Sequence, residues 1–134
     1  MLQAHKGDAG AVSSSVRAAF GAPAPTLREE IAAALFQPGE AILQPAARAR
    51  FLTVGRAAAG EGASVRVESI GSDPAARRFD GWELAAARAA SLARAIQEGG
   101  LDARRIDLAI DGTRAMQGQG QIEGQRLRVI VQPR

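Results

Sequence analysis

The stretch Ser72–Ala89, SDPAARRFDGWELAAARA, joins a polar loop to the clearest helical pattern in the chain. Asp80 precedes Glu83 by three residues. This is the capping-box arrangement, because the aspartate accepts from early backbone amides of the helix and the glutamate reaches back to the cap. The helix is predicted to continue to about Glu98, where a glycine pair ends it.

The segments around this helix predict a β-sheet. Alternating apolar and polar residues, typical of strands, occur in Ser64–Ile70 (SVRVESI), Arg105–Ile110 (RIDLAI) and Arg126–Val131 (RLRVIV). Pro45 suits the first position of a further helix, which should extend to about Ala59 with Gly60 beyond its end. Thr26–Phe36 (TLREEIAAALF) fits either a short helix or a first strand. Strands that alternate with helices predict a sheet with helices packed on it.

The chain divides into a leader and one domain. In the leader, Ala11–Phe20 has helical spacing, and Ala22–Pro25 (APAP) forms a stiff linker, since X-Pro pairs disfavour helix. We therefore assign residues 1–25 to a leader with a short helix and residues 26–134 to the domain. The 134 residues suffice for one hydrophobic core.

Composition excludes several classes of function. The chain has no cysteine and a single histidine, which excludes disulfides, thiolate zinc sites, histidine-based catalytic triads and multi-histidine metal sites. It shows no phosphate-binding glycine loop either, so we expect no catalytic activity, no metal and no cofactor. The net charge of +3 comes from arginines spread along the chain, whereas nucleic-acid binders cluster their charge; we expect no nucleic-acid partner. Neither a signal peptide nor a membrane span is apparent.

Several motifs resemble the OmpA-like peptidoglycan-binding domain family. Its members carry a T-D step, a loop, and a helix with an N-x-x-L-S-x-x-R-A pattern. Here Ser72-Asp73 is followed by a loop and by Gly81–Ala89 (GWELAAARA). Leu35–Ala47 (LFQPGEAILQPAA) is similar to the family's L-F-x-x-G-x-A-x-L-x-P segment, and WELAAARAAS is similar to the version in MotB flagellar stator proteins.

The resemblance implies a mixed four-stranded α+β sandwich in the order β-α-β-α-β-β, with its helices on one side of the sheet. It also favours a strand over Ile31–Phe36. The implied function is a non-catalytic periplasmic domain that anchors a stator complex to the cell wall. Such a protein would be a homodimer with a MotA-like membrane partner. The sequence would then be an excerpt of a longer membrane-anchored protein, with Met1 added.

The resemblance also implies a binding site for the diaminopimelate of the peptidoglycan stem peptide. Asp73 would bind the ammonium group and Arg88 the carboxylate of this zwitterion. Ser72 and Gly81 occupy family site positions, and Arg126 matches an arginine of the family's N-R-R step, where it would support the site. Here that step is Gly124-Gln125-Arg126, while Gly81 and Ala85 replace Asn and Ser.

Other interpretations remain open at these positions. Asp73 could cap a turn beside Pro74, Arg88 could be a surface charge of its helix, and Trp82 fits packing over the helix start better than stacking on a sugar. At the level of the whole chain, the alternatives are an OmpA-like domain of another envelope protein, or a structural domain without affinity for peptidoglycan.

Overall fold

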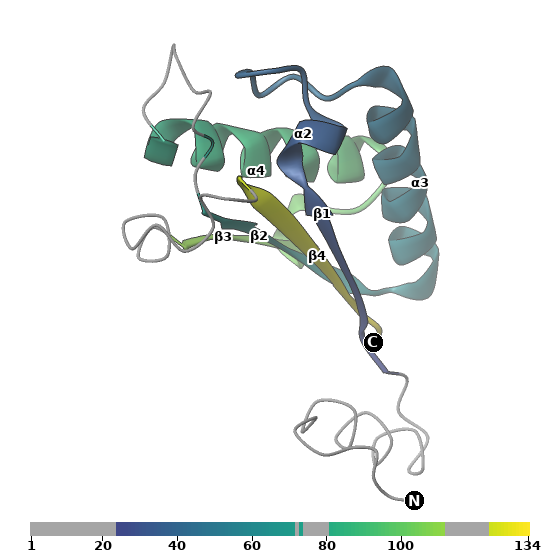
Figure 1. Ribbon diagram of the computed structural model, residues 1–134. Helices are drawn as coiled ribbons and strands as arrows, with labels where there is room; N and C mark the ends of the chain where they lie inside the picture. Colours follow the sequence, from purple (N-terminus) through teal and green to yellow (C-terminus); the bar gives the residue numbers. More distant parts are fainter. Residues whose placement is uncertain (1–23, 72, 74–80, 112–123) are drawn as a thin grey trace, which may run out of the picture.

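A mixed four-stranded sheet in the order β1-β4-β2-β3 forms one layer of the domain, and two long helices form the other (Figure 1). The computed structural model describes residues 24–71, 73, 81–111 and 124–134. Its elements are β1 (Thr26–Ile31), α2 (Ala32–Leu35), α3 (Pro45–Glu61), β2 (Ser64–Ile70), α4 (Gly81–Glu98), a 3-10 turn (Ala103–Arg105), β3 (Ile106–Asp111) and β4 (Arg126–Gln132). The predicted α+β architecture is confirmed.

The register of the sheet separates an apolar face from a charged one. β2 pairs with β3 in parallel and with β4 antiparallel, while β1 pairs with β4 antiparallel at the sheet edge. Val65 and Val67 of β2 lie opposite Val131 and Val129 of β4 on the helix-covered face. The residues between them are mostly charged and lie on the open face, so β2 and β4 show the two-residue alternation of a half-buried sheet.

The core lies between the sheet and the paired helices α3 and α4. It is built from Phe51 and Ala58 of α3, Leu92 and Ile96 of α4, and the apolar strand residues. The two helices approach closely because glycines stand at their contacts. A Cβ atom on Gly55 would lie 1.8 Å from the carbonyl oxygen of Ile96, and one on Gly99 would lie 2.0 Å from that of Leu52.

The structure corrects two element boundaries. The predicted strand over Ile31–Phe36 is wrong, because the strand ends at Ile31 and Ala32–Leu35 forms a helical turn. Its AAAL sequence lacks the β-branched residues that favour strands, and the turn buries Ala32 and Leu35 in the core. Helix α3 also continues past Gly60 to Glu61; Gly62 ends it, in a left-handed conformation with φ of 67°.

The remaining elements follow the predictions closely. β2 has the predicted bounds, β3 starts and ends one residue later than predicted, and β4 is one residue longer. The leader helix and the Asp80 cap lie outside the described residues. None of the helices in the described part is long and apolar enough to cross a membrane.

Candidate functional site

Arg88 is the largest fully buried side chain among the described residues, with 1% of its surface exposed. It lies on the sheet-facing side of α4, where Leu84, Ala85, Ala89 and Leu92 recur at helical spacing and are also buried. An arginine is almost never buried to this degree unless its charge is paired and its N–H groups are hydrogen-bonded. Its surroundings must therefore supply acceptors.

Three acceptors surround the Arg88 guanidinium. Nε donates to the backbone carbonyl of Glu40 at 2.8 Å, and Nη1 donates to Asp73 Oδ2 and to Gln125 Oε1, each at 2.9 Å. The ring of Phe36 lies 5.2 Å from the guanidinium carbon, within range of a cation–π interaction. Arg88 thus connects α4 to the loop after α2, the segment after β2 and the start of β4.

Gln125 orients the guanidinium through a short chain of hydrogen bonds. Its side chain is 2% exposed, and its Nε2 donates to the hydroxyl of Ser69, which is fully buried in β2. The Gln125 carbonyl accepts from the amide of Ala32 at 2.8 Å. This backbone bond extends the β1–β4 pairing by one residue and fixes Gln125 where the two strands begin to pair. Because its amide group is bonded at both ends, Gln125 presents its oxygen, not its nitrogen, to Arg88.

Asp73 supplies the carboxylate of the site. It follows the end of β2 and Gly71, whose φ of 80° turns the chain away from the strand direction. The Asp73 side chain remains 18% exposed, whereas its partner Arg88 is 1% exposed. Of the two partners, Asp73 is therefore the more accessible to solvent.

One nitrogen of the Arg88 guanidinium, Nη2, takes no part in these hydrogen bonds. Within the described residues, Nε and Nη1 account for every hydrogen bond of this guanidinium, and Nη2 makes none. A guanidinium can bind a carboxylate through its remaining N–H groups while keeping its structural contacts. The arrangement thus combines a fixed cation with an adjacent, partly exposed anion.

The structure places the five predicted site residues in different surroundings. Asp73 and Arg88 are in direct contact. Gly81 is the first residue of α4, two turns before Arg88. Arg126 is on the opposite face of the sheet from Gln125, where its Nη1 donates to Glu29 Oε2 at 2.5 Å. Ser72 lies outside the described residues.

Three contributors to the site were not predicted from the sequence. Ser69 and the carbonyl of Glu40 carried no local signal, since a strand serine and a loop carbonyl are common features. Gln125 occupies the middle position of the N-R-R step, where it departs from the family pattern. The alternation of β4 could have indicated it: if Leu127 and Val129 face the core, Gln125 faces it too.

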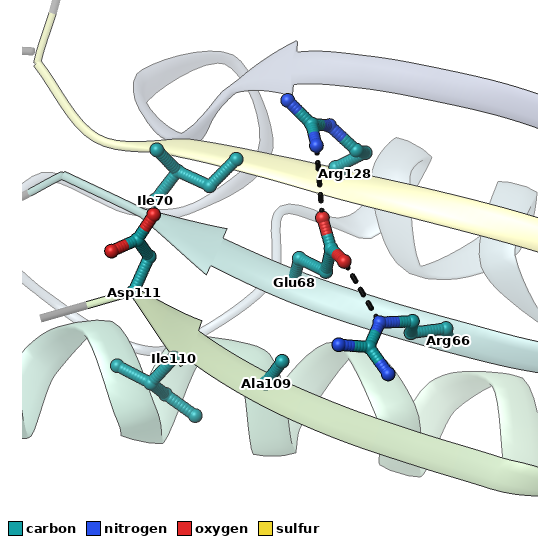
Figure 2. Close-up of a pocket in the computed structure, with 7 residues that line it drawn as sticks. All are labelled: Arg66, Glu68, Ile70, Ala109, Ile110, Asp111 and Arg128. Atoms are coloured by element: carbon teal, nitrogen blue, oxygen red, sulfur yellow. Dashed lines mark hydrogen bonds and ion pairs between the residues drawn. The ribbon is translucent and has the colours of Figure 1, made fainter. Parts of the chain in front are cut away.

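A second charged cluster lies on the open face of the sheet, where Figure 2 shows Glu68 between two arginines. Arg128 donates to Glu68 Oε1 at 3.0 Å and Arg66 to Glu68 Oε2 at 2.8 Å. Arg128 also bonds Glu29 of β1, which accepts from Arg126 as well. The hydrogen bond from Arg126 is the main cause that holds the pKa of Glu29 below its ordinary value of 4.5. Both glutamates of this cluster therefore bind arginines. No group of acidic or histidine side chains in the described part could hold a metal ion.

The fold and the site together define an α+β domain built around a buried arginine that is paired with a partly exposed aspartate. The chain belongs to the OmpA family, whose model matches residues 35–127, more than half of its length. A search of curated proteins found no matching sequence.

Solved structures show the same fold at low sequence identity. A putative MotB-like protein from Desulfovibrio vulgaris has a TM-score of 0.59 and 17% identity over 95% of this chain and 93% of that one. The periplasmic domain of Helicobacter pylori MotB has a TM-score of 0.62 and 13% identity over 80% of this chain and 79% of that one. The cell wall anchor of the type VI secretion system (T6SS) from Pseudomonas aeruginosa has a TM-score of 0.62 and 18% identity over 92% and 94%.

Proposed function

We propose that this domain binds peptidoglycan without catalysis and anchors an envelope complex to the cell wall. The observation that carries the proposal is the Arg88–Asp73 ion pair at the end of β2. The end of a diaminopimelate side chain bears an ammonium and a carboxylate on one carbon. A fixed guanidinium beside a carboxylate is complementary to that pair of charges in sign and in spacing.

In this proposal each residue has a separate part in binding. Arg88 Nη2 donates to the ligand carboxylate, while Asp73 accepts from the ligand ammonium. Gln125 and the Glu40 carbonyl hold the other guanidinium donors, so the cation does not have to reorient when the ligand arrives. Because Asp73 is the more exposed partner, the ligand approaches from its side.

Co-sedimentation with purified peptidoglycan tests this assignment. The informative variant is Asp73→Asn, and its matched control is Glu68→Gln, because both carboxylates bind an arginine and both side chains are 18% exposed. We expect wild type and Glu68→Gln to sediment with the peptidoglycan and free diaminopimelate to release both. Asp73→Asn should stay in the supernatant. Equal retention of wild type and Asp73→Asn would contradict the site.

The biological setting is a second level of the proposal. We place the domain in the periplasm, as part of a homodimeric MotB-like stator anchor with a MotA-like partner in the membrane. The likeness to MotB domains supports this setting. The T6SS anchor is covered as fully by the same fold, so an anchor of another envelope complex is the alternative. The reading frame upstream distinguishes them, since a stator requires a single membrane span that carries an acidic residue.

The burial of Arg88 favours one further candidate function. At 1% exposure, and with bonds to three separate segments, Arg88 could serve only to fix the fold. Titration with diaminopimelate, measured by calorimetry, distinguishes the two roles. Saturable binding supports the anchor, and no heat of binding together with no sedimentation would leave a purely structural domain.

A further inference from the structure

β1 is an edge strand that exposes two large apolar side chains. It pairs with β4 on one side, and no strand of the described chain pairs with it on the other. Leu27 is 59% exposed and Ile31 is 45% exposed. Leu27 lies two residues before Glu29 and Ile31 two residues after it, so all three side chains are on the open face of the sheet. Exposed apolar residues on an unpaired edge favour pairing with another strand.

One backbone hydrogen bond determines which residues of β1 point outward. The amide of Ala32 donates to the carbonyl of Gln125, the residue directly opposite it when the β1–β4 register is continued. In an antiparallel pair, hydrogen-bonded and non-hydrogen-bonded residues alternate. Arg28 and Glu30 therefore exchange hydrogen bonds with β4. The amides and carbonyls of Leu27, Glu29 and Ile31 point towards the open edge.

We propose that β1 pairs with β1 of a second copy of this chain, antiparallel and about a two-fold axis at Glu29. This register uses the outward groups of Leu27, Glu29 and Ile31 and joins the two sheets into one. It places Leu27 directly opposite Ile31 of the second copy. The two-fold axis is perpendicular to the sheet, so the helices of both copies cover the same face and the open faces are continuous.

The charges of β1 are complementary to themselves in this register. On the helix-covered face, Arg28 lies opposite Glu30 of the second copy, and that glutamate also binds Arg50 of its own chain. On the open face the two Glu29 residues meet at the axis, and each is already bound to Arg126 and Arg128 of its own chain. The arginines offset the repulsion that two adjacent carboxylates would otherwise produce.

The opposite edge of the sheet lacks this self-complementarity. β3 carries only acidic charges, Asp107 and Asp111, so two copies paired along it would bring charges of one sign together. Its exposed apolar residue is Leu108, which lies on the helix-covered side opposite Val67. The contrast assigns the contact to β1.

This inference specifies how the homodimer of the proposed function forms. It rests on the proposed homodimer and does not depend on peptidoglycan binding. Cysteine cross-linking tests the register directly, because the chain contains no native cysteine. At the axis, Glu29→Cys meets its own counterpart with Cα atoms about 5.5 Å apart, a separation that a disulfide can span. Under mild oxidation we expect this variant to form a covalent dimer.

Two further cysteine variants serve as matched controls. Leu27→Cys and Ile31→Cys each lie about 14 Å along the strand from their own counterparts, too far for a disulfide. Each alone should remain uncross-linked, whereas an equimolar mixture of the two should give the mixed dimer. Failure of Glu29→Cys to cross-link, or equally fast cross-linking of Leu27→Cys alone, would overturn the register.

Sedimentation equilibrium of the cysteine-free protein tests the surface itself. Leu27→Asp should weaken self-association by about tenfold or more, and Leu108→Asp on the other edge strand should leave it unchanged. A dimer that is insensitive to Leu27→Asp would overturn the β1 contact and leave the dimer itself in place. A chain that is monomeric at every concentration would overturn both, and the peptidoglycan assay would still decide the anchor function separately.

Discussion

Two arginine–carboxylate clusters lie on opposite faces of the same sheet. On the helix-covered face, Arg88 binds Asp73 at 2.9 Å, and on the open face Arg128 binds Glu68 at 3.0 Å. The two carboxylates are equally exposed, at 18%. The arginines differ, because Arg88 is 1% exposed and Arg128 is 31% exposed.

We expect burial, not ion-pair geometry, to set how much each cluster contributes to the stability of the fold. A buried guanidinium has lost its water and depends on every remaining acceptor, so removing one side of the pair leaves a large uncompensated cost. On the open face, water and salt replace a lost partner at little cost. The four predictions below test this contrast, from the largest expected effect to the smallest.

Arg88→Met should give the largest loss of stability. The substitution leaves the carboxylate of Asp73, the side chain of Gln125 and the carbonyl of Glu40 without their shared donor. We expect the free energy of unfolding in urea to fall by about 3–5 kcal/mol. Arg128→Met is the control and should cost below about 1 kcal/mol. Equal losses in the two variants would contradict the contrast.

Gln125→Ala should give the next largest effect. The change removes a buried acceptor from Arg88 and a buried partner from Ser69. Unsatisfied buried polar groups cost on the order of 1–3 kcal/mol, measured as a shift of the urea midpoint at constant m-value. Gln132→Ala, at the other end of β4, is the control and should change stability little. A midpoint unchanged by Gln125→Ala would show that water satisfies both groups.

Glu68→Gln should have a small effect that depends on salt. The glutamate joins two arginines that are 31% and 51% exposed, so the loss should be about 0–1 kcal/mol and should decrease further in 1 M salt. Unfolding experiments at low and high salt measure this decrease. A loss that persists at 1 M salt would mean that the open-face cluster is shielded from solvent, as it would be beneath a partner.

The pH dependence of Glu29 should give the smallest effect. Its pKa is lowered in the folded state, chiefly by the hydrogen bond from Arg126, so the unfolded state binds a proton more readily. The stabilisation is present above the ordinary pKa of 4.5 and is lost as pH falls through the folded value. Glu29→Gln should therefore reduce the stability difference between pH 7 and pH 3. An unchanged difference would exclude Glu29 as a contributor.

The local patterns of the sequence predicted most of the fold. Alternation defined β2, β3 and β4 to within about a residue, because the apolar residues of each strand recur every second position on the face towards the helices. The first strand was misplaced, since TLREEI has no regular alternation to mark it. Thr26–Ile31 is a strand because β4 supplies its hydrogen bonds, and this tertiary pairing overrides local propensity.

The candidate site was predicted only in part, because some of its residues are far apart in the sequence. Motif spacing indicated Asp73 and Arg88, which are 15 residues apart and do form an ion pair. Gln125 is 37 residues from Arg88 and enters the site only because β4 lies beside β2 in the sheet. Arg126 belongs to the same step and lies on the open face, because a one-residue shift along a strand moves a side chain to the other face.

The sequence by itself determined the order of the elements, the family motifs and the two charged residues of the candidate site. These properties depend on neighbours within one or two helical turns or along one strand, where spacing defines geometry. Only the tertiary structure decided that Arg88 is buried, that Gln125 and the Glu40 carbonyl hold it, and that β1 forms an edge. Burial and edge position depend on which segments meet in the folded chain, and no local pattern predicts the strand order β1-β4-β2-β3.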